Sequence, residues 1–361
     1  MILHRYFARR FFVTFAGVFA VFAAMTVLLD LVEKLRGFSA NAEFPQILSL
    51  TLLSAPGALY RILPLIMILT TVALFLGLAR SSELVVTRAA GRSAIRSLIS
   101  PLIVATIIGC IGVAVVNPIV AATSKELERR SDELRGRSST LKISSDGFWL
   151  RQGNADRQTV IRALTTNLDG TELQNVTFIT FEGGPVQRVE AESARLSDGA
   201  WVLSNAKIWP LAETRNPEAD ALTRGSFSIP STLTADQIRD SFGAPSSIPI
   251  WELPGFISRL ETAGFAARRH QMWLQSELAQ PLFLLAMVLI GAGFTMRHQR
   301  GGRTGMMVLL AIMFSFGLYF LRNFANVLGE NGQIPVILAA WAPPLIGIGM
   351  SLGFLLHLED G

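Results

Sequence analysis

Long apolar runs alternate with basic or polar segments along the chain. Six runs contain no Asp, Glu, Lys or Arg and reach the roughly 17–25 residues that a helix needs to cross the hydrocarbon core of a bilayer. They comprise residues 11–29, 62–79, 97–120, 278–296, 305–321 and 334–356. The pattern predicts an α-helical membrane protein with six transmembrane helices, and the low content of charged residues, 16%, agrees with it.

The segments on one side of these runs are basic. Arg5, Arg9 and Arg10 precede the first run, which is longer than the apolar part of a signal peptide and has no small-residue cleavage site after it. The loops after the second and fourth runs hold Arg80, Arg88, Arg92, Arg96, Arg297, Arg300 and Arg303. Because excess Lys and Arg mark the cytoplasmic side of a membrane, both termini are predicted to be cytoplasmic. The net charge of +5 then reflects topology rather than nucleic-acid binding.

A polar segment, residues 123–269, separates the third and fourth runs. Stretches rich in Val, Ile, Thr, Phe and Trp cover residues 159–164, 175–181, 186–196 and 200–209, with turn-forming Gly, Asp and Pro residues between them. Strand spacing of about ten residues is typical of a sandwich or jelly roll. The segment therefore predicts an all-β, jelly-roll-like periplasmic domain, and a spacer without a function of its own is the alternative.

The predicted organisation has three parts. Residues 1–122 hold transmembrane helices 1–3, residues 123–269 hold the outer domain with its return linker, and residues 270–361 hold transmembrane helices 4–6.

The chain lacks the motifs of common catalytic and nucleotide-binding sites. It has no His-Glu-x-x-His pair, no Gly-x-Ser-x-Gly elbow and no P-loop. Cys110 is the single cysteine, which excludes a disulfide or a cysteine metal site within one chain. We therefore expect no catalytic residue, metal or cofactor in this chain. The absence of charge inside the runs gives little support to ion-coupled transport, so another chain must supply the energy for any uphill transport.

The loop after the second run contains a candidate helix, SSELVVTRAAGR over residues 81–92. Glu83 near its start suits the helix dipole, and Arg88 and Arg92 lie one turn apart toward an end near Gly91. A solvated connecting helix and a coupling helix that docks on a cytoplasmic ATPase explain this pattern equally well.

Three segments carry a resemblance to a known family. SELVVTRAAG (82–91), GFWLRQGN (147–154) and QMWLQSELAQPL (271–282) resemble the lipopolysaccharide export permease family LptF/LptG, also called YjgP/YjgQ, and the resemblance covers essentially the whole chain. The last two segments favour the G-type subunit, LptG. The F-type subunit has the same architecture and is the nearest alternative.

This resemblance implies a non-catalytic permease subunit of an ABC transporter in the bacterial inner membrane. Two such permeases would form a pair on a dimer of an LptB-type ATPase, which binds ATP and Mg, and an LptC-type single-span protein would join them. The complex would extract lipopolysaccharide from the inner membrane and pass it to a periplasmic bridge toward the outer membrane.

The resemblance also implies roles for particular residues. Glu83 would be the main polar contact to the ATPase, with Leu84, Val85 and Arg88 as the docking face and Ser82 and Gly91 at its ends. Candidates for contact with the lipid headgroup lie near the outer ends of the first three helices: Lys34, Arg36, Arg61, Arg129 and Arg130. Ordinary interfacial anchoring explains these residues nearly as well. Asp30 and Lys34 are spaced to pair at i,i+4, which weakens the expectation of a phosphate clamp there.

Two other classes compete with this assignment. ABC-linked permeases that handle lipoproteins have four spans and a large outer domain after the first helix, whereas here the domain follows the third run. A membrane hydrolase would need a catalytic set that the sequence does not display.

Overall fold

The computed structural model describes residues 2–38, 43–83, 86–87, 93–135, 141–144, 147–153, 157–167, 170–212, 216–231, 233–234, 238, 244–262, 266–296 and 304–360. The chain divides into two compact units. The helical unit comprises Met1–Leu134, Ser246–Trp251 and His270–Gly361, and the β unit comprises Arg135–Pro245 and Glu252–Arg269.

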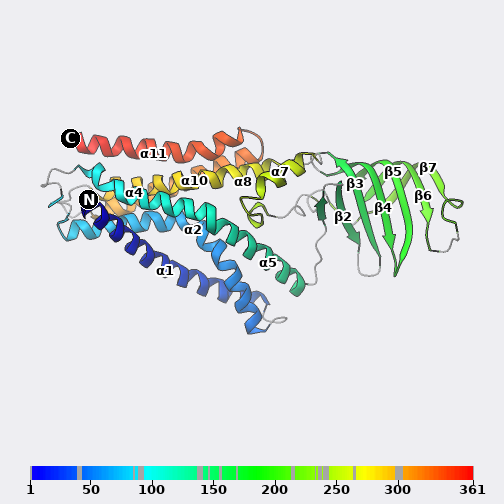
Figure 1. The fold of residues 1–361 in the computed structure, drawn as a ribbon, viewed down its shortest axis with the longest axis horizontal. Helices are drawn as coiled ribbons and strands as arrows, with labels where there is room; N and C mark the ends of the chain where they lie inside the picture. The colour runs from blue at the N-terminus through cyan, green and yellow to red at the C-terminus, as the bar shows by residue number, and fades with distance from the viewer. Residues whose placement is uncertain are drawn as a thin grey trace. The chain divides into compact units, whose positions relative to one another are not determined.

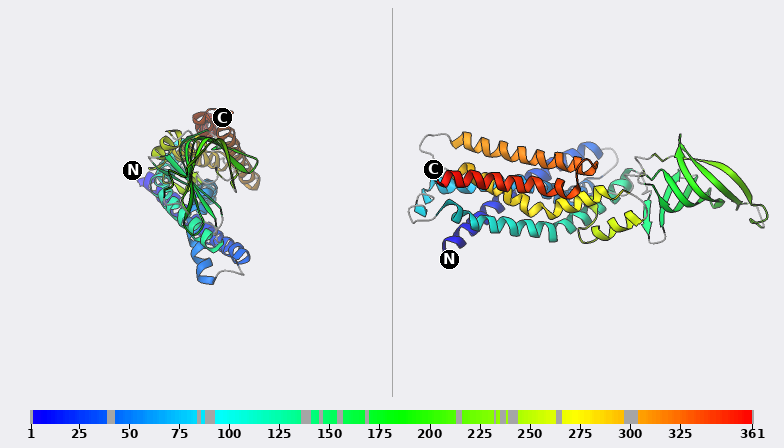
Figure 2. Two further views of the ribbon diagram at one scale, coloured as in Figure 1. Left: turned by 90° about the vertical axis from the view of Figure 1, so that its right-hand side faces the viewer. Right: turned by 90° about the horizontal axis from the view of Figure 1, so that it is seen from above.

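The helical unit is built from long helices, shown in Figure 1. They are α1 (Ile2–Phe38), α2 (Phe44–Arg80), α4 (Ala94–Ile111), the π-helix η1 (Gly112–Val116), α5 (Asn117–Arg135), α8 (Arg268–Leu278), α9 (Gln280–Thr295), α10 (Thr304–Glu330) and α11 (Val336–Asp360). Figures 1 and 2 place the start of α1 and the end of α11 at the same end of this unit.

Among the described residues, five helical stretches are long and apolar enough to cross a membrane. They lie in α1, α2, the continuous stretch from α4 to α5, α10 and α11. The pair α8 and α9 passes the same test but is bent by 49° at its break, and it makes a sixth span if the pair crosses as one. Each of the six predicted runs lies on one of these elements, so the prediction of a helical membrane protein is confirmed.

Most of the segment between the first two apolar runs, residues 30–61, is helical and does not form a loop. Because α1 continues to Phe38 and α2 begins at Phe44, Asp30, Lys34 and Arg61 lie on helices. A charged residue ends an apolar run but does not end a helix, since Glu, Lys and Arg are good helix formers.

The centre of the helical unit is α9, which packs against α2, α4, α10 and α11. Phe283, Met287 and Ile290 are buried, as expected for a helix that is apolar on every side. The approach of α4 to α9 is very close at Gly109, where an added Cβ would lie 2.7 Å from the Cα of Pro281. Only glycine permits this contact.

The third span is not a regular α-helix. Between α4 and α5, the backbone N–H of Asn117 bonds to the carbonyl of Gly112, five residues earlier. Such single π-turns are rare and often mark functional positions.

The β unit contains one seven-stranded antiparallel sheet in the order β1 to β7. The strands are β1 (Leu141–Ser144), β2 (Gly147–Gly153), β3 (Gln158–Thr166), β4 (Glu172–Phe181), β5 (Pro185–Ser197), β6 (Ala200–Pro210) and β7 (Leu222–Pro230). Figure 2 shows the twist of the sheet. The short 3₁₀ turn η2 (Pro245–Ser247) and helix α7 (Leu253–Thr262) follow.

The all-β class of this domain is confirmed, but its strands form a meander, in which each strand pairs with the next one in the chain. Regular strand spacing is equally compatible with a meander, a sandwich and a jelly roll, because it reflects only the length of the hairpins and not which strands pair. At the predicted turn between β5 and β6, Asp198 and Gly199 both have positive φ, 50° and 74°, as a two-residue type I′ hairpin requires. Phe178 and Trp201 pack edge to face in the core of the sheet.

We expect Gly109→Ala to destabilise the protein by roughly 1–3 kcal/mol, because the new methyl group must push α4 away from Pro281. Thermal unfolding of the purified protein in detergent measures the effect. Gly17→Ala, on a helical glycine with nothing within 4 Å of the added Cβ, is the control and should leave stability unchanged or slightly higher. Equal stability of the two variants would contradict the close packing of α4 on α9.

Candidate functional site

The candidate coupling segment begins with a sharp turn at the end of α2. Ser82 has a positive φ of 58°, the left-handed conformation that turns the chain out of a helix. Helical geometry resumes at Glu83, Val86 and Thr87, where the N–H of Val86 bonds to the carbonyl of Ser82 at 3.2 Å and the Thr87 hydroxyl donates to the carbonyl of Glu83. The other predicted docking residues, Leu84, Val85, Arg88 and Gly91, lie outside the described residues.

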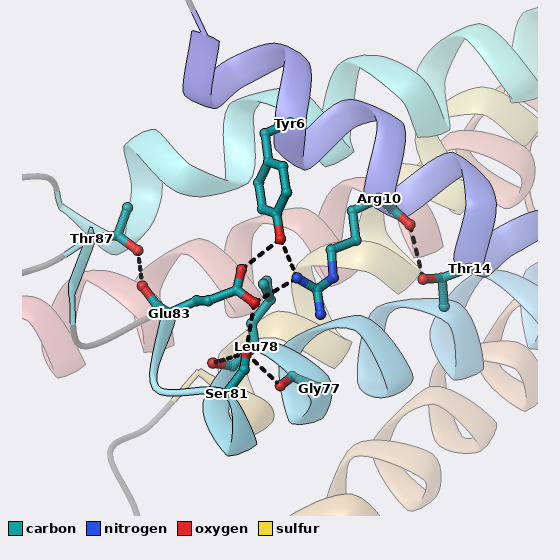
Figure 3. A network of polar contacts seen from close by, with 8 residues as sticks. All are labelled: Tyr6, Arg10, Thr14, Gly77, Leu78, Ser81, Glu83 and Thr87. Atoms are coloured by element: carbon teal, nitrogen blue, oxygen red, sulfur yellow. Dashed lines mark hydrogen bonds and ion pairs between the residues drawn. The ribbon is translucent and has the colours of Figure 1, made fainter.

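The carboxylate of Glu83 is held by residues far away in the sequence, as Figure 3 shows. Arg10 donates to one carboxylate oxygen at 2.6 Å, and Ser81 donates to the same oxygen at 2.8 Å. Tyr6 donates to the other oxygen at 2.7 Å and accepts a hydrogen bond from Arg10. We call Tyr6, Arg10, Ser81 and Glu83 the Glu83 network. It ties the segment after α2 to the first turns of α1.

The electrostatics keep Glu83 charged. Burial alone would raise the pKa of its carboxyl, but the donors Tyr6, Ser81 and Arg10 outweigh burial and hold the pKa below its ordinary value. The network therefore persists at neutral pH and weakens only as the pH falls through this lowered pKa. Because the side chains of Arg10 and Glu83 are 35% and 32% exposed, the ion pair contributes at most about 1 kcal/mol. Its main effect is to link this segment to α1.

Lys34, the first of the predicted headgroup residues, is engaged within the chain. Its ammonium donates to Asp30 at 2.6 Å, to the carbonyl of Leu50 at 3.0 Å and to Ser54. These acceptors match its three protons. Lys34 therefore joins α1 to α2.

Two of the other four headgroup candidates are ion-paired on α5, and two are exposed on α1 and α2. Arg129 and Arg130, on α5, both bond to Glu126, and Arg130 also reaches Ser49 of α2 at 3.3 Å. The structure thus brings Lys34 and Arg130 to the same part of α2. Arg36 and Arg61 are exposed, on α1 and α2.

A buried polar cluster around Glu277 was not predicted from the sequence. The carboxylate of Glu277 on α8 accepts hydrogen bonds at one oxygen from Tyr60 of α2, at 2.5 Å, and from Asn117 of α5, at 3.1 Å. Arg322 of α10 donates to the neighbouring carbonyl of Ser276 at 3.3 Å and lies over the ring of Phe283. Glu277 and Asn117 are only 3% and 2% exposed.

Both charged members lie at the edges of predicted apolar runs. Glu277 directly precedes residue 278, and Arg322 directly follows residue 321. When a predicted span is ended at the first charged residue, Glu277 and Arg322 fall outside the predicted spans. Their sequence position alone does not distinguish them from ordinary charged residues at the ends of spans, which extend toward the interface.

A polar cavity of about 220 Å³ adjoins this cluster. Its lining includes Tyr60, Arg61, Glu277 and Arg322. The indole nitrogen of Trp273 and the side-chain oxygen of Gln280 also belong to lining residues, and both atoms are buried without a hydrogen-bond partner in the described part of the chain. Arg61 is thus the exposed member of a larger polar site. No group of three or more His, Cys, Asp or Glu that suits a metal ion occurs among the residues described.

The comparisons with known proteins agree on one family. The model of the family "Lipopolysaccharide export system permease LptF/LptG" matches residues 5–357. The chain is 24% identical over 366 residues to the lipopolysaccharide export system permease protein LptG of Escherichia coli (strain K12), with 99% of this chain and 98% of that protein covered. It is 23% identical over 371 residues to the LptG protein of Haemophilus influenzae, with 99% of each covered. Since the family model spans nearly the whole sequence, the chain belongs to the lipopolysaccharide export permease family LptF/LptG.

Proposed function

We propose that this chain is the LptG-type subunit of a transporter that extracts lipopolysaccharide from the inner membrane and passes it to a periplasmic bridge. The observation that carries the proposal is the family match over residues 5–357, which makes the chain a lipopolysaccharide export permease subunit and a multi-pass inner-membrane protein. The names of the E. coli and H. influenzae relatives support the G type over the F type.

The position of the β unit also favours this class over the lipoprotein-handling permeases. The β unit enters the chain after α5, at the end of the third span, and not after the first helix.

The proposed orientation places the termini in the cytoplasm and the β unit in the periplasm. Arg5, Arg9, Arg80 and Arg96, at the start of α1 and around the loop between the second and third spans, are all exposed. Basic residues of this kind mark the cytoplasmic side. A domain that follows three spans then lies on the opposite side from the N-terminus.

The proposed partners are an LptB-type ATPase dimer, an LptF-type permease and an LptC-type single-span protein. ATP and Mg would bind to the ATPase, and this chain would perform no catalysis of its own. We propose that residues 82–91 dock on the ATPase and that the Glu83 network passes its motion to α1. The contacts of Glu83 with Tyr6 and Arg10 support this route.

We expect Glu83→Ala to reduce both co-purification of the ATPase and lipopolysaccharide release from proteoliposomes about tenfold, as expected for the loss of a hydrogen-bonded charge. Pull-down of the complex and a lipid-release assay measure the two effects. Arg9→Gln, which removes an exposed neighbouring charge, is the control. If Glu83→Ala behaves like this control in both assays, the proposed coupling role is wrong.

The variant Arg10→Gln distinguishes docking on the ATPase from transmission of its motion to α1. Because Arg10 holds Glu83 from within α1, its loss should leave co-purification of the ATPase unchanged while lipid release per ATP hydrolysed falls about fivefold, the effect of roughly 1 kcal/mol. Parallel measurement of phosphate and lipid release tests this. A normal ratio of lipid to phosphate in Arg10→Gln would show that the contact with α1 transmits nothing.

For the headgroup candidates, we propose that Arg61 contacts anionic groups of the lipid, since it is exposed and lines a polar cavity. Arg61→Ala should lower the lipopolysaccharide retained on the purified complex about tenfold, the effect of one charge-assisted hydrogen bond. Lys34→Ala should instead lower thermal stability, because its ammonium is bonded to Asp30, Leu50 and Ser54. Mass spectrometry of retained lipid and thermal unfolding distinguish the two. If Lys34→Ala lowers the retained lipid and Arg61→Ala does not, the assignment of headgroup contact to Arg61 is wrong.

A further inference from the structure

The sequence of the β unit is interrupted by six residues that belong to the helical unit. Residues Ser246–Trp251 belong to the helical unit, whereas Pro245 and Glu252 on either side belong to the β unit. This short segment, which we call the return segment, is therefore joined covalently at both ends to the β unit. A displacement of the return segment therefore moves its covalent neighbours Pro245 and Glu252, which belong to the β unit.

Two hydrogen bonds fasten the return segment to the irregular part of the third span. The backbone N–H of Ile250 donates to the side-chain oxygen of Asn117 at 3.0 Å, and Ile250 is buried. The indole N–H of Trp251 donates to the carbonyl of Ala114 at 3.3 Å, although the Trp251 side chain is largely exposed.

The sequence of the third span explains why Ala114 can accept this bond. In an α-helix the carbonyl of Ala114 would bond to the N–H of residue 118, but residue 118 is proline and has no N–H. The π-helix Gly112–Val116 lies at the same place. A carbonyl without its α-helical donor is costly in an apolar environment, and the indole of Trp251 supplies the donor.

The side chain of Asn117 connects the return segment to the core of the helical unit. Its oxygen accepts from Ile250, and its nitrogen donates to Glu277, whose carboxylate also accepts from Tyr60. The ring of Tyr60 packs so closely on Gly112 that an added Cβ there would lie 3.3 Å from it. Hydrogen bonds thus run without a break from α2 through α8 and α5 to the return segment.

We propose that Tyr60, Asn117, Glu277, Ile250 and Trp251 form a polar clamp that transmits rearrangements of the helical unit to the chain of the β unit. This inference rests on the proposed transport function, because it assigns the clamp a role in coupling ATP hydrolysis to delivery of lipid. Tyr60, Asn117 and Glu277 are positioning residues: they hold the return segment in place from within the helical unit.

The test uses Trp251→Phe in the complete complex with its ATPase, reconstituted in proteoliposomes that contain lipopolysaccharide. This variant removes the indole N–H but keeps an aromatic ring at an exposed position, so folding should be preserved. Trp209→Phe is the matched control, because the Trp209 indole also makes one hydrogen bond, to Glu218 at 2.6 Å, within the β unit. Asn117→Ala is the second variant and removes the bonds to both Ile250 and Glu277.

We expect amide hydrogen exchange in residues 246–251 to become about fivefold faster in Trp251→Phe, as expected for the loss of one hydrogen bond. Lipid delivered per ATP hydrolysed should fall by a similar factor while the rate of ATP hydrolysis stays unchanged. Asn117→Ala should accelerate exchange further, and Trp209→Phe should change neither quantity.

Three results would overturn the clamp. They are unchanged exchange in residues 246–251, faster exchange with normal delivery per ATP, and a parallel loss of hydrolysis and delivery that indicates damage to the fold. If the unmodified complex delivers no lipopolysaccharide at all, the proposed function fails instead. The exchange measurements would still report on the hydrogen bonds of the clamp.

Discussion

The burial of one carboxylate, that of Glu277, organises the helical unit. An ionised carboxylate among apolar helices is very unfavourable unless hydrogen bonds and opposite charge compensate it. Its hydrogen-bond partners come from two separate elements, Tyr60 from α2 and Asn117 from α5, and Arg322 of α10 packs beside the end of α8. Each partner fixes the position of one helix relative to α8. Close contacts of Gly109 with Pro281 and of Gly112 with Tyr60 also pack the third span against α9 and α2.

The bilayer explains why irregular backbone collects at the same place. Inside a membrane, a carbonyl that loses its helical partner must find another donor. The π-helix of the third span, the 49° bend between α8 and α9, and Pro118 all lie near Glu277 and Asn117 in the sequence. Polar side chains from neighbouring elements are available there, and the Trp251 indole bonds to Ala114 as such a donor. Irregular backbone and buried polar groups therefore stabilise one another.

Hydropathy predicted the spans well because it measures a property of each segment alone. It failed where a residue's environment depends on distant partners. Asn117 and Glu277 are 160 residues apart and Arg10 and Glu83 are 73 residues apart, so no local pattern could pair them. The same limit explains why the spacing of Asp30 and Lys34 predicted their ion pair, whereas the bonds from Lys34 to Leu50 and Ser54 of α2 were not predicted. It also explains the topology of the β unit, since strand spacing does not specify which strands pair.

Helix α2 connects the two sites that the proposed function needs. Its last turn leads into Ser81 and the Glu83 network, and Tyr60, 21 residues earlier, anchors the polar clamp. At 1.5 Å per residue these points are about 32 Å apart along one continuous helix. Pro64 lies between them and cannot donate to the carbonyl of Tyr60, so the helix lacks a backbone hydrogen bond at the residue that anchors the clamp. In the proposed mechanism, motion at the Glu83 end of α2 would change the angle of the helix where this backbone hydrogen bond is missing. The hydrogen bond from Tyr60 to Glu277 would pass that change to Asn117 and the return segment.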